Sequence, residues 1–250
     1  MTSPAPVQAI LFDLFDTLVL FERERLPRLV VNGREVRSTA GQLHEVLRRH
    51  ANTVPLDQCY DALLWSWQEA ERLRAVDHRE VPAAERFGFW LTRLDVDPAG
   101  CPAGFVESLL DTHRRELAKA AEFPAHHGPL LERLAQRFRL AVVSNFDYTP
   151  TALGILEAGG VVDLFATIVV SDEVGWRKPR REIFDVALER LGVAPADAVF
   201  VGDRADIDVL GAQRVGMRVA WINRKAEPLP PDIPPPTWEL RDLAELEGLI

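Results

Sequence analysis

Five short, continuous apolar runs are the feature of this sequence that most constrains its fold. Each run is rich in β-branched or aromatic residues and is bounded by polar or turn residues, which is the pattern of a buried strand. Because the runs do not alternate strictly between apolar and polar residues, they favour a parallel sheet that is covered on both faces. The predicted strands are residues 8–12, 139–144, 165–171, 198–202 and 218–222.

Helical spacing of apolar residues accompanies the last four of these strands. Alternation of strands and helices predicts a doubly wound, Rossmann-like α/β sheet. The predicted helices are residues 128–137, 150–158, 181–191 and 208–215. A Pro-rich stretch from Pro228 to Pro236 then predicts an extended connector, and residues 240–249 have the pattern of a short final helix.

Between the first two strands, about a hundred residues lie from Leu20 to Phe123, far more than an ordinary connection of roughly 2–6 residues. Within this insertion, an Asn32-Gly33 dipeptide predicts a hairpin over residues 29–36. Helical spacing follows over residues 38–50, 56–76, 82–94 and 103–120. We therefore expect two domains: an α/β core from residues 1–20 plus 121–250, and a mainly helical cap from residues 21–120.

Composition excludes several classes of protein. The 250 residues include 38 Asp and Glu against 29 Lys and Arg, a net charge of −9, which argues against a nucleic-acid partner because phosphate binding needs clustered cations. No apolar run reaches the ~18 residues of a membrane span, and the N-terminal stretch lacks the charged start of a leader. Cys59 and Cys101 lack C-x-x-C spacing, so we expect a cytoplasmic protein without a disulfide framework. Monomer and homodimer both stay open.

Polar residues stand at the ends of the predicted strands. Asp13 follows the first strand, Ser144 ends the second, and Asp203 follows the fourth, with Asp208 five residues later; Lys178 precedes the helix after the third. Because ligands bind beyond the carboxyl ends of parallel strands, we expect these groups to converge. The carboxylates suit Mg²⁺, and the hydroxyl and the ammonium group suit a phosphate. Alone, each residue also fits a turn, a helix cap or a solvated surface.

Four short motifs, in order along the chain, resemble those of the haloacid dehalogenase-like hydrolase superfamily. The strand placement and the position of the insertion match that family too, and residues 173–179 look like the lead-in of its subfamily with a helical cap. The motifs are Asp13-x-x-x-Thr17-Leu18-Val19, Ser144-Asn145, Lys178-Pro179 and Gly202-Asp203-x-x-x-x-Asp208.

The resemblance implies a role for each matching residue. Asp13 would be the nucleophile, forming an aspartyl-phosphate, and also a Mg²⁺ ligand. The backbone carbonyl of Phe15 and the Asp203 carboxylate would be further ligands, and Asp208 would lie at the edge of the metal or orient its ligands. The transferring group would be bound by Ser144 and Lys178, with hydrogen bonds from Asn145.

Phe15 departs from the pattern of the family's phosphatases. They usually have a second Asp there, which protonates the leaving alcohol and later activates water, and phenylalanine can do neither. The side chain of Asp16 should leave an extended backbone on the other side, so it is a poor substitute. General acid–base help is worth ~10²–10⁴ in rate, and its loss matters most for poor leaving groups.

Three functions remain open. The first is a Mg²⁺-dependent hydrolase of a small-molecule organophosphate, acting through Asp13. The second is a 2-haloacid dehalogenase; members with that activity often have an aromatic residue at the position of Phe15, but their fourth motif lacks the Gly-Asp pair kept here as Gly202-Asp203. The third is a non-catalytic binding protein on the same fold. A phosphonatase that uses a cap lysine is disfavoured, because Lys119 is the only lysine between residues 20 and 123.

Overall fold

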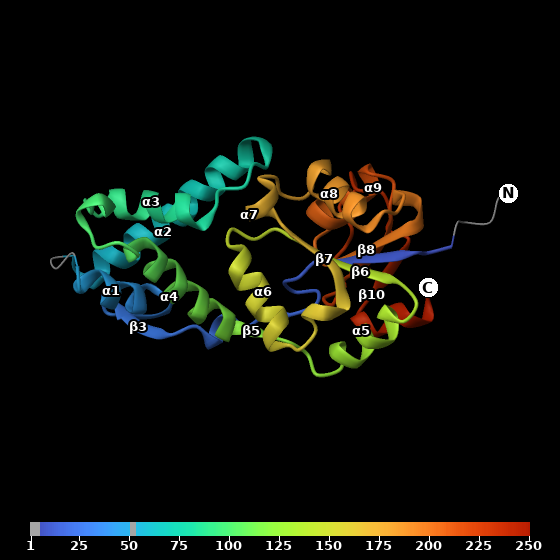
Figure 1. The fold of residues 1–250 in the computed structure, drawn as a ribbon, viewed down its shortest axis with the longest axis horizontal. Coiled ribbons are helices and arrows are strands. Elements are labelled where there is room, and N and C mark those ends of the chain that lie inside the picture. Colours follow the sequence, from blue (N-terminus) through green and yellow to red (C-terminus); the bar gives the residue numbers. More distant parts are fainter. Residues whose placement is uncertain (1–5, 51–53) are drawn as a thin grey trace. The chain divides into compact units, whose positions relative to one another are not determined.

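The chain folds into two units, and the computed structural model describes residues 6–50 and 54–250 (Figure 1). One unit contains Met1–Phe21 and Glu122–Ile250, and the other contains Glu22–Ala121. Two short strands, β2 (Leu20–Phe21) and β5 (Ala121–Glu122), pair where the chain passes between the units. Over the described residues, no helix is both long and apolar enough to span a lipid bilayer.

A six-stranded sheet, all of whose neighbours run parallel, forms the centre of the first unit. Its order is β10-β9-β8-β1-β6-β7. Five of these strands lie where the apolar runs predict them, which confirms the Rossmann-like α/β fold class. They are β1 (Ala9–Phe12), β6 (Arg139–Ser144), β7 (Phe165–Val170), β8 (Ala198–Gly202) and β9 (Arg218–Ile222).

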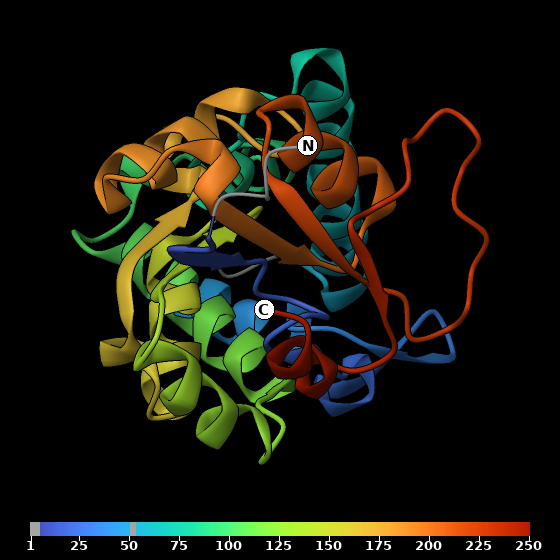
Figure 2. The same ribbon diagram turned by 90° about the vertical axis from the view of Figure 1, so that its right-hand side faces the viewer.

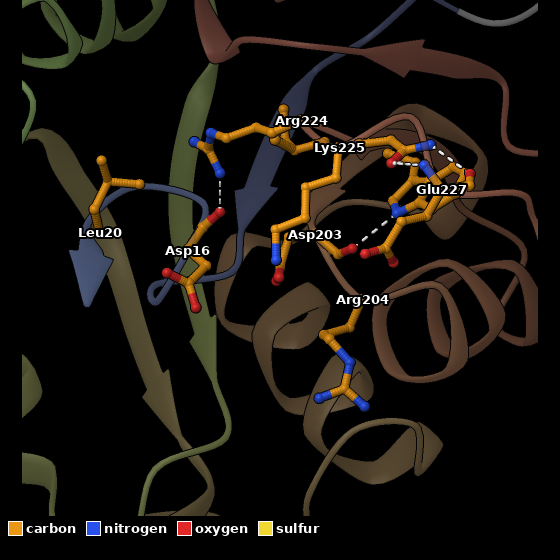
Figure 3. Close-up of a pocket in the computed structure, with 10 residues that line it drawn as sticks. Asp16, Leu20, Asp203, Arg204, Arg224, Lys225 and Glu227 are labelled. Atoms are coloured by element: carbon orange, nitrogen blue, oxygen red, sulfur yellow. Dashed lines mark hydrogen bonds between the residues drawn. The ribbon is translucent and has the colours of Figure 1, made fainter. Parts of the chain in front are cut away.

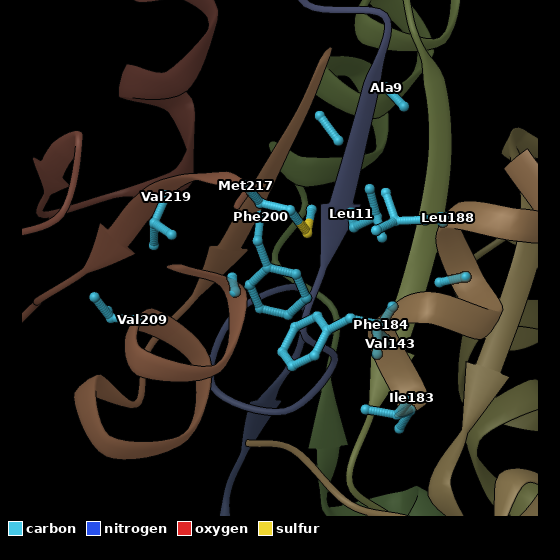
Figure 4. Packing of buried hydrophobic residues seen from close by; sticks show 14 of the residues in the cluster. Ala9, Leu11, Val143, Ile183, Phe184, Leu188, Phe200, Val209, Met217 and Val219 are labelled. Carbon is cyan, nitrogen blue, oxygen red and sulfur yellow. The ribbon is translucent and has the colours of Figure 1, made fainter. Parts of the chain in front are cut away.

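Helices cover both faces of this sheet. α8 (Arg181–Leu191) and α9 (Leu210–Arg214) lie on one face, and α5 (His127–Ala135) lies on the other (Figures 1 and 2). Under α8, the rings of Phe184 and Phe200 meet edge to face at 5.2 Å (Figure 4). The remaining helical elements are α6 (Thr149–Ala158), α7 (Ser171–Val174), η3 (Val162–Leu164), η4 (Pro195–Asp197) and η5 (Ala205–Val209).

The C-terminal segment differs from its prediction. The expected helix over residues 240–249 is instead the end of a sixth strand, β10 (Trp238–Leu240), followed by a 3₁₀-helix, η6 (Leu243–Gly248). Three residues are too few for a periodic pattern, and β10 is fixed by pairing with β9. Residues 223–237 project as a long loop between the two strands (Figure 2), in agreement with the predicted Pro-rich connector.

The second unit begins with the predicted hairpin, formed by β3 (Arg28–Val31) and β4 (Arg34–Arg37). Its turn residues, Asn32 and Gly33, have φ values of 50° and 72°, the left-handed conformation that two-residue hairpin turns need. All four predicted helices form, and they bury a core around Phe87 and Trp90. The helical elements are η1 (Arg23–Arg25), α1 (Ala40–Arg48), α2 (Leu56–Asp77), α3 (Ala83–Arg93), η2 (Pro98–Gly100) and α4 (Phe105–Ala120).

Candidate active site

The ends of β1, β6 and β8 bring three polar residues to one edge of the sheet. Residues of β1 pair in register with both β6 and β8, so these strands end side by side. Asp13 is the first residue beyond β1, and its N–H still donates to the Val201 carbonyl of β8 at 2.8 Å. Ser144 is the last residue of β6, and Asp203 is the first beyond β8.

Lys178 joins this edge from the segment between α7 and α8. Its Nζ lies 2.5 Å from Asp13 Oδ1 and 2.9 Å from Asp208 Oδ1, and the Lys178 side chain is only 1% exposed. The Nζ also lies 5.1 Å from the centroid of the Phe200 ring. Burial works against the charged form, but the two carboxylates outweigh it and raise the pKa of Lys178. The side chain is therefore a buried ammonium ion.

Asn145 holds the backbone of Lys178 rather than presenting its amide to a ligand. Its Nδ2 donates to the Lys178 carbonyl at 2.9 Å, and its Oδ1 accepts from the Lys178 N–H at 2.7 Å. Both amide functions are thus engaged with the chain that carries the lysine. The sequence predicted that either the side chain or the backbone of Asn145 binds the transferring group. Because the side-chain amide is engaged with Lys178, only the backbone of Asn145 remains for that role.

Three carboxylates form an acidic cluster at the same edge. One oxygen from each of Asp13, Asp203 and Asp208 lies within 4.8 Å of the others. Burial, opposed by Lys178 and reinforced by Asp208, raises the pKa of Asp13 to about 6. Burial together with Asp13 and Asp208 raises the pKa of Asp203 to about 8. Such crowding of hard oxygen donors is relieved by a divalent cation, so these residues fit a Mg²⁺ site.

The spacing between Gly202 and Asp208 has a structural reason. η5 is a π-helical turn that carries Asp208 back over the end of β8, where its Oδ2 accepts from the Arg204 N–H at 3.0 Å. A Cβ on Gly202 would lie 2.4 Å from that oxygen. Glycine at this position therefore lets the Asp208 carboxylate reach Lys178.

Two buried hydroxyls at this edge lack partners. The Ser144 Oγ and the Thr17 Oγ1 make no hydrogen bond within the part of the chain that the structure describes, and both residues are fully buried. An unsatisfied buried hydroxyl costs free energy, and an anionic ligand such as a phosphate would accept from it. Thr17 was part of the first sequence motif but was given no role; its small hydroxyl within that motif was the available signal.

The adjacent residues Phe15 and Asp16 have different surroundings, and neither side chain is placed as a general acid. The Phe15 ring packs against Phe146 at 4.9 Å and Phe21 at 5.9 Å between centroids, so its position offers an aromatic surface and no proton donor. Asp16 has a left-handed φ of 56°, and its Oδ1 accepts from the Phe21 N–H at 3.3 Å. The Asp16 carboxylate is thus engaged within its own loop.

A pocket of about 340 Å³ adjoins the acidic cluster (Figure 3). Asp16 and Asp203 line it together with residues that follow β9. The Trp221 Nε1 donates to the Asp203 carbonyl at 2.8 Å, and the Arg224 guanidinium donates to the Asp16 carbonyl. Sequence reasoning missed Arg224, although the strand-end rule that found Asp13 applies equally to the end of β9.

The carboxylates, the buried lysine and the two unpartnered hydroxyls thus lie at one edge of a Rossmann-like core, which makes this edge a candidate hydrolase site. The sequence model described as haloacid dehalogenase-like hydrolase matches residues 7–216, and the protein belongs to that family. The Escherichia coli pyrimidine 5'-nucleotidase YjjG is 31% identical over 166 residues, covering 66% of this chain and 69% of its own. A glyceraldehyde 3-phosphate phosphatase of Methanopyrus kandleri is 28% identical, covering 87% of this chain and 84% of its own.

Solved structures share the fold. A phosphatase of the same family from Thermococcus onnurineus has a TM-score of 0.65 at 24% identity and covers 97% of both chains. A 2-haloacid dehalogenase from Pseudomonas syringae pv. Tomato DC3000 has a TM-score of 0.70, also at 24% identity and with 97% of both chains covered. The fold is therefore shared by a protein named as a phosphatase and by one named as a dehalogenase.

Proposed function

We propose that the protein is a Mg²⁺-dependent hydrolase of small phosphorylated metabolites that acts through a phosphorylated Asp13. The observation that carries the proposal is the acidic cluster of Asp13, Asp203 and Asp208 around the buried Lys178 ammonium group. A dehalogenase that attacks carbon does not need a cation-binding cluster. The phosphatase and nucleotidase names of the similar proteins support the same class of reaction.

In this proposal the charges of the site are divided between two groups of residues. Asp13, Asp203 and Asp208, with the Phe15 carbonyl, would hold Mg²⁺, which would neutralise phosphate charge when bound. Lys178 keeps one Asp13 oxygen in an ion pair and adds positive charge beside the phosphoryl group. The unpartnered hydroxyls of Ser144 and Thr17 donate to phosphoryl oxygens.

The reaction then proceeds in two displacements. An oxygen of the Asp13 carboxylate attacks phosphorus, the bond to the leaving oxygen breaks, and Asp13 becomes phosphorylated. Water then attacks that phosphorus, which releases inorganic phosphate and restores the carboxylate. Phe15 supplies no proton to the leaving oxygen in the first displacement. Acyl and aryl phosphates should therefore be better substrates than alkyl phosphates, because their leaving groups need no protonation.

The test is hydrolysis of an aryl phosphate by the parent protein with and without Mg²⁺. Asp13→Asn should reduce turnover by at least about 10³-fold, because it removes the nucleophile. Asp206→Asn is the matched control, since the Asp206 carboxylate pairs with the exposed Arg204 guanidinium and should leave turnover unchanged. Full activity in Asp13→Asn would contradict the mechanism.

Phe15→Asp distinguishes a phosphatase site that lacks only its general acid from a site adapted to another reaction. A gain of about 10²-fold or more on an alkyl phosphate, with a smaller gain on the aryl phosphate, is expected when the missing group is restored. The measurement is kcat for both substrates in both proteins. Loss of activity on both would show that the aromatic contacts of Phe15 serve the native reaction.

A carbon–halogen hydrolase is the second candidate, favoured by the aromatic cluster of Phe15, Phe21 and Phe146. Halide release from a 2-haloacid in the absence of metal would support it. If neither phosphate nor halide is released by the parent or by Phe15→Asp, a binding role on this fold becomes the better account.

A further inference from the structure

A second group of metal-ligating side chains lies at the start of α5 and shares no residue with the acidic cluster. His126 precedes α5, His127 is its first residue, and Asp242 precedes η6 near the C-terminus. One ring nitrogen of each histidine and one carboxylate oxygen of Asp242 lie within 4.8 Å of one another. The tertiary structure thus joins residues more than a hundred positions apart.

His127 has the hydrogen bonding that is typical of a metal ligand. It is only 1% exposed, and its Nδ1 lies 2.8 Å from the Leu18 carbonyl. Because a carbonyl only accepts, Nδ1 carries the proton and the lone pair stands on Nε2. Nε2 is therefore the ring nitrogen that can bind a cation while Nδ1 keeps its hydrogen bond to Leu18. Histidines that bind metals usually donate their other ring N–H to a carbonyl or carboxylate in this way.

His126 and Asp242 lie at the separation that two ligands of one ion need. The His126 Nε2 and the Asp242 Oδ1 are 3.2 Å apart, and two ligands at about 2.0–2.1 Å from a tetrahedral ion stand roughly 3.3 Å from each other. The same Oδ1 accepts from the Ala244 N–H at 2.8 Å, which fixes the orientation of the carboxylate. The N-terminal dipole of α5 opposes a cation here, and the charge of Asp242 offsets it.

We propose that His126, His127 and Asp242 bind one late first-row divalent cation of the Zn²⁺ type, with water as the fourth ligand. Two imidazoles and one carboxylate are a ligand set that zinc prefers, whereas Mg²⁺ prefers oxygen. The ion would tie the C-terminal η6 to the start of α5. Through His127 it would also tie both to Leu18, in the loop that follows Asp13.

Two variants remove ligands while they keep the local hydrogen bonds. His127→Asn retains a donor for the Leu18 carbonyl but removes Nε2, and Asp242→Asn retains a good helix cap but removes the charge. His78→Asn is the matched control, because His78 is an exposed imidazole in the helical unit, in a left-handed conformation that asparagine accepts. Circular dichroism checks that each variant is folded.

The probe is Co²⁺ in the presence of excess Mg²⁺, followed by the visible absorption of four-coordinate cobalt, and then displacement by Zn²⁺. The parent and His78→Asn should bind one equivalent, and each ligand variant should lose at least about tenfold in affinity. Zn²⁺ should also raise the thermal midpoint of the parent and of the control only. Equal Co²⁺ binding by the parent and both ligand variants, or no saturable binding by the parent, would overturn the proposal. Mg²⁺-dependent phosphatase activity is assayed in the same proteins. Failure of the proposed phosphatase activity can therefore be distinguished from failure of the proposed cation site.

Discussion

Asp203 shows, at the scale of one residue, how a buried carboxylate in an acidic cluster costs stability. Burial and two neighbouring carboxylates raise its pKa from 3.8 to about 8. The folded state therefore keeps a proton that the unfolded state releases, so stability present below about pH 4 is lost as pH rises towards 8. A cation bound to the ionised carboxylate would remove this loss of stability.

We predict that Asp203→Asn stabilises the metal-free protein at pH 8 by on the order of 2 kcal/mol, because asparagine cannot ionise. The difference from the parent should shrink towards pH 4, where both folded and unfolded Asp203 are protonated. Urea denaturation of both proteins across this range measures the effect. Mg²⁺ should then stabilise the parent more than the variant. An identical pH dependence in the two proteins would contradict the prediction.

At the scale of elements, the end of β8 and the η5 turn form one unit that places Asp208. The turn brings the carboxylate within 2.9 Å of the Lys178 Nζ, and the absence of a side chain on Gly202 leaves the space for it. Asn145, the first residue after β6, holds the backbone of Lys178 itself through two hydrogen bonds. The lysine is thus positioned by two separate elements.

We predict that Gly202→Ala lowers the free energy of unfolding by about 1–3 kcal/mol, because its Cβ would overlap the Asp208 carboxylate. Displacement of Asp208 should also reduce phosphatase turnover. Gly128→Ala is the control: Gly128 lies within α5 with open space around its Cβ position, and alanine favours a helix. Denaturant melts and kcat are measured for both. Comparable stability in the two variants would show that Asp208 relaxes without cost.

At the scale of the whole molecule, the helical unit is inserted into the α/β unit through two neighbouring crossings. Its first residue, Glu22, donates its N–H to the Ala120 carbonyl at 2.8 Å, so the insertion begins and ends at nearly the same point. The acidic cluster and Lys178 belong entirely to the α/β unit. Their placement therefore needs no residue of the insertion.

We predict that replacing residues 22–121 by a Gly-Ser linker of about six residues yields an α/β unit that folds cooperatively. Thermal unfolding by circular dichroism should show one transition, and Mg²⁺ should raise its midpoint. The same excision carrying Asp203→Asn is the control, and its midpoint should respond less. Absence of a cooperative transition would show that the helical unit contributes to the stability of the core.

Up to β9, the sequence by itself determined where the main strands and helices form, because apolar periodicity and turn residues are local properties of the chain. It also brought Asp13, Ser144, Lys178, Asp203 and Asp208 to one edge, since parallel strands end together. Whether these residues perform the proposed roles stays a prediction.

Tertiary structure alone decided the contacts that join distant segments. β10 exists because β9 offers it an edge, and Asn145 acts on Lys178 because two loops meet there. The pairing of His126 with Asp242 likewise joins the start of α5 to the start of η6. Such contacts join residues that are far apart in the sequence. The periodic pattern of each separate segment therefore does not predict which distant segment it will contact.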